Sequence, residues 1–158
     1  LRSVSVESMD IGDIQERSGV QIVWYINKGS RQKSSIKPLT AKTIVAINEY
    51  LITRGAFQDH WPLFATHSAS RKGQRLSRRS MRLIFHKRLE AIGIVDKQIT
   101  LHSTRHTHGV ISTKAIGAHE TQLSLGHSSG ETTRIYNQSS DEDIILLNRS
   151  GKAIDALL

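Results

Sequence analysis

The feature that most constrains the fold is a run of β-branched and aromatic residues at positions 19–26, Gly-Val-Gln-Ile-Val-Trp-Tyr-Ile. Such side chains favour strands because they fit a pleated, half-buried surface. Polar residues and a glycine at 27–30 end the run, and residues 32–39 return as a second strand that ends near Pro38. We therefore expect an antiparallel hairpin with residues 28–33 at its tip.

A third strand is expected just upstream of the hairpin. Residues 10–14, Asp-Ile-Gly-Asp-Ile, are typical of a turn that leads into a short strand. Before them, Val6 and Met9 stand three apart, as they would near the end of a helix. The first part of the chain thus predicts a small three-stranded antiparallel sheet.

Helices are expected to follow the sheet. Apolar residues recur at helical spacing after Thr40, and Gly55 ends that segment. The apolar stripe of this helix consists of Thr43, Ile44, Ile47, Tyr50 and Leu51. Residues 61–64, Trp-Pro-Leu-Phe, are then predicted to form a buried connector.

Two longer helices are predicted in the middle of the chain. The first begins after Ser77, a residue type suited to an N-cap. Its core-facing residues would be Met81, Phe85, Leu89 and Ile92. The second would be capped by Ser103 or Thr104 and would run to about Ile116.

The end of the chain predicts further helices, at 119–125, at 131–137 and after the acidic residues 141–143, whose charge suits the positive end of a helix.

The expected class is therefore α+β and mainly helical, with one small three-stranded antiparallel sheet near the N-terminus. One domain is expected to cover residues 1–158. Because the chain opens at Leu1 without a methionine, we interpret it as a fragment of a longer protein.

The balance of charge bears on the partner. Lysine and arginine number 22 against 14 aspartates and glutamates, which gives a net charge of +8 and a pI near 10.1. This surplus favours a polyanionic partner, nucleic acid first and an anionic membrane surface second. No apolar run approaches the ~18–20 residues of a membrane span. Since no signal peptide is visible either, we expect a cytoplasmic location. The absence of cysteine excludes disulfides, cysteine–zinc sites and a cysteine nucleophile.

His102 and Arg105 stand three apart, which places them on one face of a helix. An arginine offers a planar fork of donors that matches two phosphate oxygens. A histidine can donate a hydrogen bond to the same group or move a proton. The alternative is that His102 caps the helix and Arg105 pairs with a surface carboxylate.

His127 and Tyr136 stand nine residues apart in a polar segment rich in small residues. Gly126 leaves room there for the close approach of a ligand. Tyr136 lies on a polar stretch, whereas Tyr25 and Tyr50 have structural roles in a predicted strand and on a predicted helix stripe. In isolation, an ordinary half-buried tyrosine remains the alternative for Tyr136.

Three short boxes, taken together, resemble those of the tyrosine recombinases, the phage-type integrases. Residues 125–129, Leu-Gly-His-Ser-Ser, with Tyr136 nine residues after the histidine, resemble the terminal box of that family. Residues 102–107, His-x-x-Arg-His-Thr, resemble the middle box, and Leu1-Arg2 resembles the end of the first box. The resemblance covers essentially the whole chain. It implies the catalytic domain of a site-specific recombinase, without the N-terminal DNA-binding region.

Carried over residue by residue, the resemblance implies a nucleophile, a phosphate clamp and proton donors. Tyr136 would attack a DNA phosphodiester and form a 3′-phosphotyrosyl link. Arg2 and Arg105 would clamp the non-bridging oxygens, on which charge develops in the transition state. His127 would bind the phosphate, and His102 would assist proton transfer at the tyrosine. Because the tyrosine–DNA bond keeps the phosphodiester energy, neither ATP nor a metal nor another cofactor is implied.

The family also carries a catalytic lysine at the tip of its β-hairpin, which protonates the departing 5′ oxygen. Lys28 resembles the family's lysine–glycine tip and is the assignment that we favour. Lys33, five residues before Pro38, also resembles a family spacing and remains the alternative. One departure concerns Ser5, which stands where the family usually has an acid, three residues after the first arginine.

The segment 71–82 is strongly basic and contains no acid. It fits contacts to DNA phosphates, which position a protein without reading sequence. The alternative is a solvated loop and helix face. The basic residues are Arg71, Lys72, Arg75, Arg78, Arg79 and Arg82.

The resemblance implies double-stranded DNA as the substrate and a homotetramer on that DNA, encoded by a bacterium or a phage. In the family the last segment docks on a neighbouring protomer. We therefore expect the C-terminal helix of this chain to dock in trans, with packing in cis as the alternative.

Three other classes compete with this interpretation. A type IB topoisomerase would share the phosphotyrosine chemistry, but the small size and compact terminal box favour a recombinase. The full set of reactive residues argues against a non-catalytic DNA-binding module. His102 and His106 could face one metal ion at i, i+4 spacing, yet no carboxylate recurs with them, so we expect no metal site.

Overall fold

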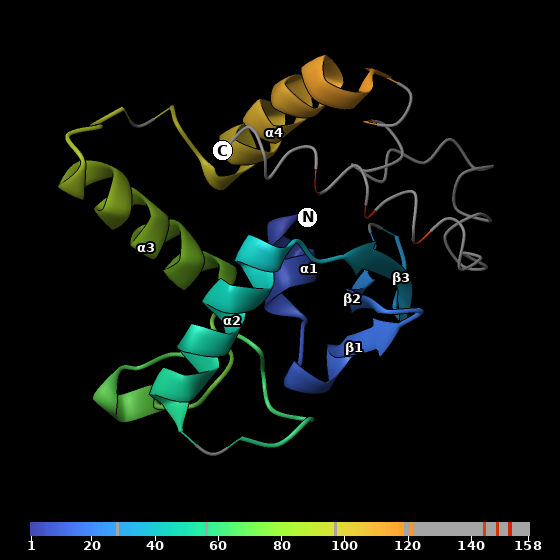
Figure 1. The fold of residues 1–158 in the computed structure, drawn as a ribbon. Helices are drawn as coiled ribbons and strands as arrows, with labels where there is room; N and C mark the ends of the chain where they lie inside the picture. Colours follow the sequence, from blue (N-terminus) through green and yellow to red (C-terminus); the bar gives the residue numbers. More distant parts are fainter. Residues whose placement is uncertain are drawn as a thin grey trace.

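The computed structural model describes residues 1–27, 29–55, 57–96 and 98–118, together with positions 121, 144, 148 and 152 (Figure 1). The α+β class and the three-stranded antiparallel sheet near the N-terminus are confirmed. The elements are α1 Ser3–Glu7, η1 Ile11–Asp13, β1 Ile14–Arg17, β2 Val20–Ile26, β3 Lys33–Pro38, α2 Ala41–Arg54, η2 Ala69–Arg71, α3 Arg78–Ala91 and α4 Leu101–Ile116. The short helix predicted at 131–137 lies outside the described residues. Of the helix predicted at 119–125 and the last predicted helix, only positions 121, 144, 148 and 152 are described.

The sheet has the order β1-β2-β3 with antiparallel neighbours, as the hairpin pattern predicts. Val23 lies at its centre and pairs with Ile14 on one side and Lys37 on the other. The register of β2 against β3 shifts between Tyr25 and Ile26. This irregularity falls just before the hairpin tip that the sequence predicts to carry the catalytic lysine.

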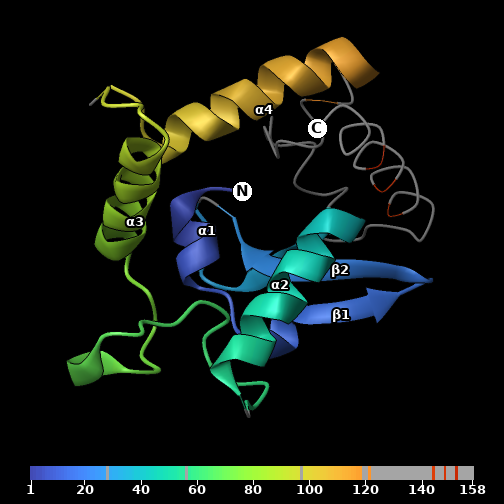
Figure 2. The same cartoon turned by 60° about the vertical axis from the view of Figure 1, so that its left-hand side comes forward.

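The two faces of the sheet carry different cores, because successive side chains of a strand point to opposite faces. On one face, Val23 and Tyr25 pack with residues of α2 and of the segments before β1 and after α2. Figure 2 shows α2 lying across this face. On the other face, Ile22 and Ile36 are each 1% exposed. The two buried clusters are Met9, Ile11, Val23, Tyr25, Leu51 and Leu63, and Val20, Ile22, Ile36 and Ile144.

Helix α2 forms where its apolar stripe predicts it. The side chain of Thr40 caps it by accepting a hydrogen bond from the amide of Thr43. Of the predicted stripe, Leu51 is buried and Thr43 is exposed. The three remaining stripe residues, Ile44, Ile47 and Tyr50, are half-buried. The stripe therefore packs along its middle and far end.

The connector after α2 is only partly buried. Leu63 is 1% exposed, as predicted, but Trp61 is 38% exposed, so the prediction is wrong for the indole. The main chain, rather than the indole, holds this segment in place. The amide of Ile11 donates to the Trp61 carbonyl at 2.9 Å, and Arg54 donates to the carbonyls of Pro62 and Leu63 at 2.7 and 2.9 Å.

Helix α3 begins after its Ser77 cap, as predicted, and stands beside the rest of the fold (Figures 1 and 2). None of its residues is fully buried. Met81, Phe85 and Leu89 are half-buried, whereas Ile92 is 70% exposed. The core-facing prediction is therefore wrong for Ile92, because the helix ends at Ala91 and Ile92 lies in the turn that follows.

Helix α4 begins earlier than its sequence predicts. The expected caps were Ser103 or Thr104, but Thr100 caps the helix by accepting from the His102 amide. Ser103 completes a capping box by accepting from the Thr100 amide at 3.0 Å. His102 therefore lies inside the first turn, and the alternative that it caps the helix is wrong. Among the helices that the structure describes, none has both the length and the apolar character needed to cross a bilayer.

Candidate phosphate-binding site

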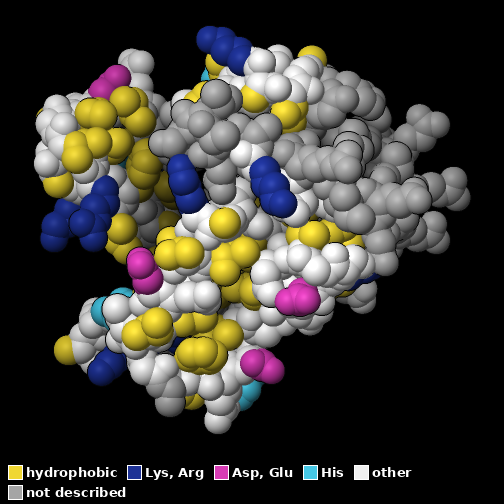
Figure 3. Space-filling model, in the orientation of Figure 1, with side chains coloured by type: hydrophobic (Ala, Val, Ile, Leu, Met, Phe, Trp, Pro, Cys, Tyr) yellow, Lys and Arg dark blue, Asp and Glu magenta, His cyan; other side chains and the backbone are white. Residues whose placement is uncertain are grey.

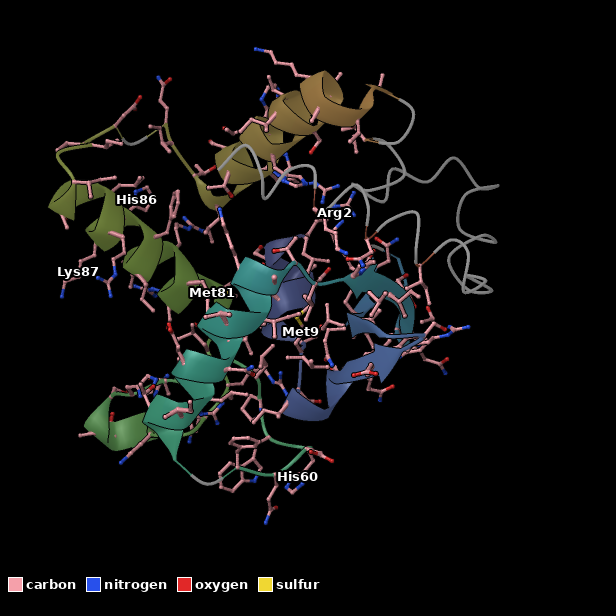
Figure 4. All side chains as sticks on the ribbon, viewed as in Figure 1. Arg2, Met9, His60, Met81, His86 and Lys87 are labelled. Carbon is pink, nitrogen blue, oxygen red and sulfur yellow. The ribbon has the colours of Figure 1, made fainter. Side chains whose placement is uncertain are left out.

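In both ribbon views the start of the chain lies between the sheet and α4 (Figures 1 and 2). Arg2 directly precedes α1 and is half-buried. Its Nη1 donates a hydrogen bond of 3.2 Å to Oδ1 of Asn27, at the end of β2 (Figure 4). This contact ties the first arginine to the hairpin.

Arg105 approaches the same place from α4. The residue is half-buried. Burial lowers the pKa of the Arg105 guanidinium, the charge of Arg2 lowers it further, and Tyr25 opposes the shift. Like charges interact in this way only at short range, so the fold brings together two arginines from opposite parts of the sequence.

Tyr25, on β2, was assigned only a structural role from the sequence. It does belong to the core, at 7% exposed. Burial raises the pKa of its phenol, while the charges of Arg105 and Arg2 oppose the shift. The phenol thus lies within the field of both arginines. A tyrosine one residue before the end of an apolar strand carries no signal that would have predicted this.

Lys37 is a further basic residue that the sequence did not single out. It lies on β3 and is half-buried as a whole. Burial of its ammonium group, and then the charge of Arg105, lowers its pKa to about 8. The only signal in the sequence was its residue type, because Lys37 is a lysine that follows Ile36 within the predicted second strand.

The histidines of α4 lie in different surroundings. His102 is exposed and His108 is half-buried. Burial lowers the pKa of His108, and the charges of Lys37 and Arg105 lower it further. Within the described part of the chain, no three His, Asp or Glu side chains gather closely enough to hold a metal ion.

The basic segment 71–82 is divided between internal contacts and solvent. Arg75 donates to the carbonyls of Glu7 and Met9 at 2.7 and 2.8 Å, and it pairs with Asp10. Nε of Arg78 lies 3.0 Å from a carboxylate oxygen of Glu7. These two arginines hold the segment against α1. All six basic residues of the segment are exposed, Arg75 and Arg78 included. On the face seen in Figure 3, basic side chains lie on α3, on α4 and near the middle of the molecule.

Comparison with known proteins identifies the family to which this chain belongs. The sequence profile described as the phage integrase family matches residues 1–143. The chain belongs to the phage integrase family. Curated relatives include the tyrosine recombinase XerC of Actinobacillus pleuropneumoniae serotype 7, with 31% identity over 86% of this chain and 42% of the relative. The tyrosine recombinase XerC of Pelobacter propionicus is 32% identical over 89% of this chain and 44% of the relative.

A more distant relative is the tyrosine recombinase XerC of Herpetosiphon aurantiacus, with 26% identity over 96% of this chain and 48% of the relative. The chain thus spans less than half the length of these relatives. No solved structure was found to match it.

The structure describes one of the two lysines that could be the hairpin lysine of the integrase family. Lys28, the favoured one, lies outside the described residues. Nζ of Lys33 lies 2.6 Å from Oδ2 of Asp10 and 2.5 Å from Oδ2 of Asp13. Both aspartates lie just before β1. Two carboxylates thus hold Lys33 in an internal contact, which speaks against the alternative assignment.

Ser5 occupies the position where this family usually has an acid. Its side chain is buried, and Oγ donates a hydrogen bond of 2.7 Å to the carbonyl oxygen of Ile26. A neutral hydroxyl therefore links α1 to the end of β2. The remaining expected catalytic residues of an integrase, His127 and Tyr136, lie outside the described residues.

Proposed function

We propose that this chain is the catalytic part of a tyrosine recombinase, which cuts and rejoins double-stranded DNA at specific sites through a 3′-phosphotyrosyl intermediate. The observation that carries the proposal is the convergence of Arg2 and Arg105, the first and middle arginines of the family pattern. Relatives of this chain bear the name tyrosine recombinase, which supports the same reaction.

The chemistry follows from where charge develops. Attack on a phosphodiester places negative charge on the non-bridging oxygens, and guanidinium groups held ready in the site stabilise it. Arg2 is pre-positioned by Asn27 and Arg105 by α4, so little reorganisation is needed when the phosphate arrives. Tyr136 supplies the nucleophile, His127 a phosphate ligand and His102 proton transfer. Lys28 is the proposed donor to the departing 5′ oxygen.

The wider arrangement is also a proposal. The net charge of +8 suits a DNA substrate. All six basic residues of segment 71–82 are exposed, and Arg75 and Arg78 also contact Glu7. Arg71, Lys72, Arg79 and Arg82 are therefore the residues proposed to contact the DNA phosphates. We propose a homotetramer on DNA, with the C-terminal helix docked on a neighbouring protomer and an N-terminal DNA-binding region elsewhere in the protein. The reaction takes place in the cytoplasm.

A nicked suicide DNA substrate tests the reaction, because loss of a short strand traps the covalent adduct. The protein that contains this chain should form an adduct, and Tyr136→Phe should abolish it while DNA binding is retained. Tyr50→Phe is the matched control: its hydroxyl serves the fold by accepting from the Ala65 amide at 3.0 Å, so its adduct should persist. An adduct that survives Tyr136→Phe would refute the nucleophile.

Strand exchange separates recombination from simple nicking and closing. Two copies of the specific site should be recombined, whereas a topoisomerase would relax any supercoiled plasmid without them. Relaxation of a plasmid that lacks the site, with no exchange between sites, would overturn the recombinase proposal in favour of a type IB topoisomerase.

A further inference from the structure

Helix α1 depends on contacts with the rest of the fold to hold its place. It is only five residues long, and the side chain of its N-cap residue, Arg2, makes no capping hydrogen bond. A helix of that length is not stable by itself. The Arg2 carbonyl accepts a hydrogen bond of 3.1 Å from the Val6 amide, so Arg2 belongs to the first turn of α1. The position of Arg2 therefore depends on whatever fixes this helix.

The far end of α1 is held by α3, which lies beside it (Figure 2). Oε1 of Glu7 accepts a hydrogen bond of 3.2 Å from the Arg78 amide, and Oε2 of Glu7 lies 3.0 Å from Nε of Arg78. Glu7 is the last residue of α1, and Arg78 is the first residue of α3. One carboxylate thus joins the two helices through both the main chain and the side chain of Arg78.

The start of α3 benefits from this carboxylate. Its first turn carries Arg78 and Arg79 and contains no acid. The N-terminus of a helix favours negative charge, because its free amide groups form the positive end of the helix dipole. Glu7 supplies from α1 the carboxylate that the first turn of α3 lacks. The contact therefore stabilises the start of α3 as well as the end of α1.

Arg75 fastens the loop before α3 to the same place. Its Nη1 donates to the carbonyls of Glu7 and Met9 at 2.7 and 2.8 Å, and its Nη2 pairs with Asp10. The basic segment 71–82 is thus anchored to the end of α1 at two of its six basic positions. The residues proposed to contact DNA phosphates lie in the chain on both sides of this anchor: Arg71, Lys72, Arg79 and Arg82.

We propose that Glu7 is a positioning residue of the recombinase reaction. It fixes the basic segment 71–82 relative to Arg2, so that DNA held by the segment presents its phosphate to that arginine. The proposal rests on the proposed function for the reaction and for the DNA ligand. The acid of the family pattern stands two residues earlier, at the position of Ser5, so that pattern does not assign this role to Glu7.

Single-turnover cleavage of a nicked suicide DNA substrate, together with binding of the same DNA by fluorescence anisotropy, separates positioning from binding. Glu7→Gln removes the charge that holds Nε of Arg78. DNA affinity should fall roughly fivefold at most, because Arg2 is one of several cations that contact the DNA. The cleavage rate of fully bound DNA should fall more, roughly a hundredfold, because a small misplacement of a catalytic group is costly. A wild-type cleavage rate in Glu7→Gln would overturn the proposal.

Glu90→Gln is the matched control, because it removes the same charge from an exposed residue at the other end of α3. It should keep affinity and cleavage rate near the wild-type values, and an equal slowing in this variant would refute a positioning role. Arg78→Gln breaks the same ion pair from its other side, so it keeps the test decisive where Glu7→Gln does not fold. Cleavage of bound DNA should also slow in Arg78→Gln, and a wild-type rate there counts against the proposal.

A double-mutant cycle on DNA affinity gives a readout that needs no cleavage. Arg2→Ala should weaken binding roughly tenfold in the wild type and in Glu90→Gln, because the phosphate loses a charged donor. In Glu7→Gln the same change should cost roughly twofold, because Arg2 no longer meets the bound phosphate. Equal costs in all three backgrounds would contradict the proposal. The adduct assay judges the recombinase reaction separately, so either proposal can fail alone.

Discussion

Ser5 and Ile26 join α1 to the end of β2 through a hydrogen bond of 2.7 Å from the serine hydroxyl to the isoleucine carbonyl. Ile26 is also where the register between β2 and β3 shifts. Two hydrogen bonds therefore reach neighbouring residues at the end of β2: Ser5 donates to Ile26, and Arg2 donates to Asn27. Both tie the helix that follows the first arginine to the strand that leads into the hairpin tip.

Ser5→Ala should loosen this link. Ser5 is 2% exposed, so the change leaves the Ile26 carbonyl without its buried donor and should cost about 1–3 kcal/mol of unfolding free energy. Urea denaturation measures this cost, and single-turnover cleavage should slow as Arg2 loses its fixed position. Ser8→Ala is the control, because its hydroxyl donates locally, to the Ser5 carbonyl three residues earlier, at 2.9 Å. Equal effects of the two variants would contradict the positioning role.

Arg105→Ala should abolish most of the transition-state stabilisation without unfolding the protein. The expected loss in cleavage rate is roughly 10²–10³-fold or more, on the scale of removing one oxyanion donor. Arg105→Lys should not restore the rate, since an ammonium lacks the planar fork. A lysine variant with the wild-type rate would show that charge alone suffices. Single-turnover cleavage and thermal unfolding give the two quantities.

Asp10→Asn should destabilise the fold because Asp10 pairs with both Lys33 and Arg75. Burial would raise the pKa of Asp10, but hydrogen bonds from those two side chains outweigh it and lower the pKa below 3.8. A lowered carboxyl pKa gives stability that is present above about pH 4 and is lost as the pH falls through the folded pKa. The expected cost at pH 7 is about 1–2 kcal/mol by urea denaturation, since the pair is partly exposed.

The pH dependence of this variant gives the control. Wild-type stability should fall more steeply below pH 4 than that of Asp10→Asn, because only the wild type must protonate this carboxylate. Glu90→Gln changes an exposed acid on α3 and should leave both the stability and its acid dependence near the wild-type values. Identical acid profiles for wild type and Asp10→Asn would exclude the network as a source of stability.

Lys37→Met should raise stability near pH 7. The folded pKa of Lys37, about 8, lies below its ordinary value of 10.5. Folding is therefore opposed fully below pH 8, and the opposition is relieved as the pH rises from about 8 towards 10.5. Wild-type melting temperature should rise across that window relative to Lys37→Met. A methionine variant that is less stable at pH 7 would indicate that Lys37 serves the fold.

Much of the local structure was predictable from the sequence. The β-branched run of β2, the Thr40 and Ser77 caps and the apolar stripe of α2 are decided by neighbours within a few residues, so their patterns are visible in the chain. The family boxes pointed to Arg2 and Arg105 through their residue types and spacing. The cap of α4 was misplaced by a few residues because Thr100, Ser103 and Thr104 all suit an N-cap.

Tertiary structure decided the rest, because it depends on pairings between distant parts of the chain. The proximity of Arg2 to Arg105 follows from α4 packing above the start of the chain. The face of Lys37 follows from its register with Val23, since a shift of one residue would turn it towards the other core. Arg75, one basic residue among six in its segment, holds α1 because the fold places the carbonyl of Glu7 beside it. Residue type and spacing thus determined which groups are chemically able to act, and long-range packing determined which of them meet.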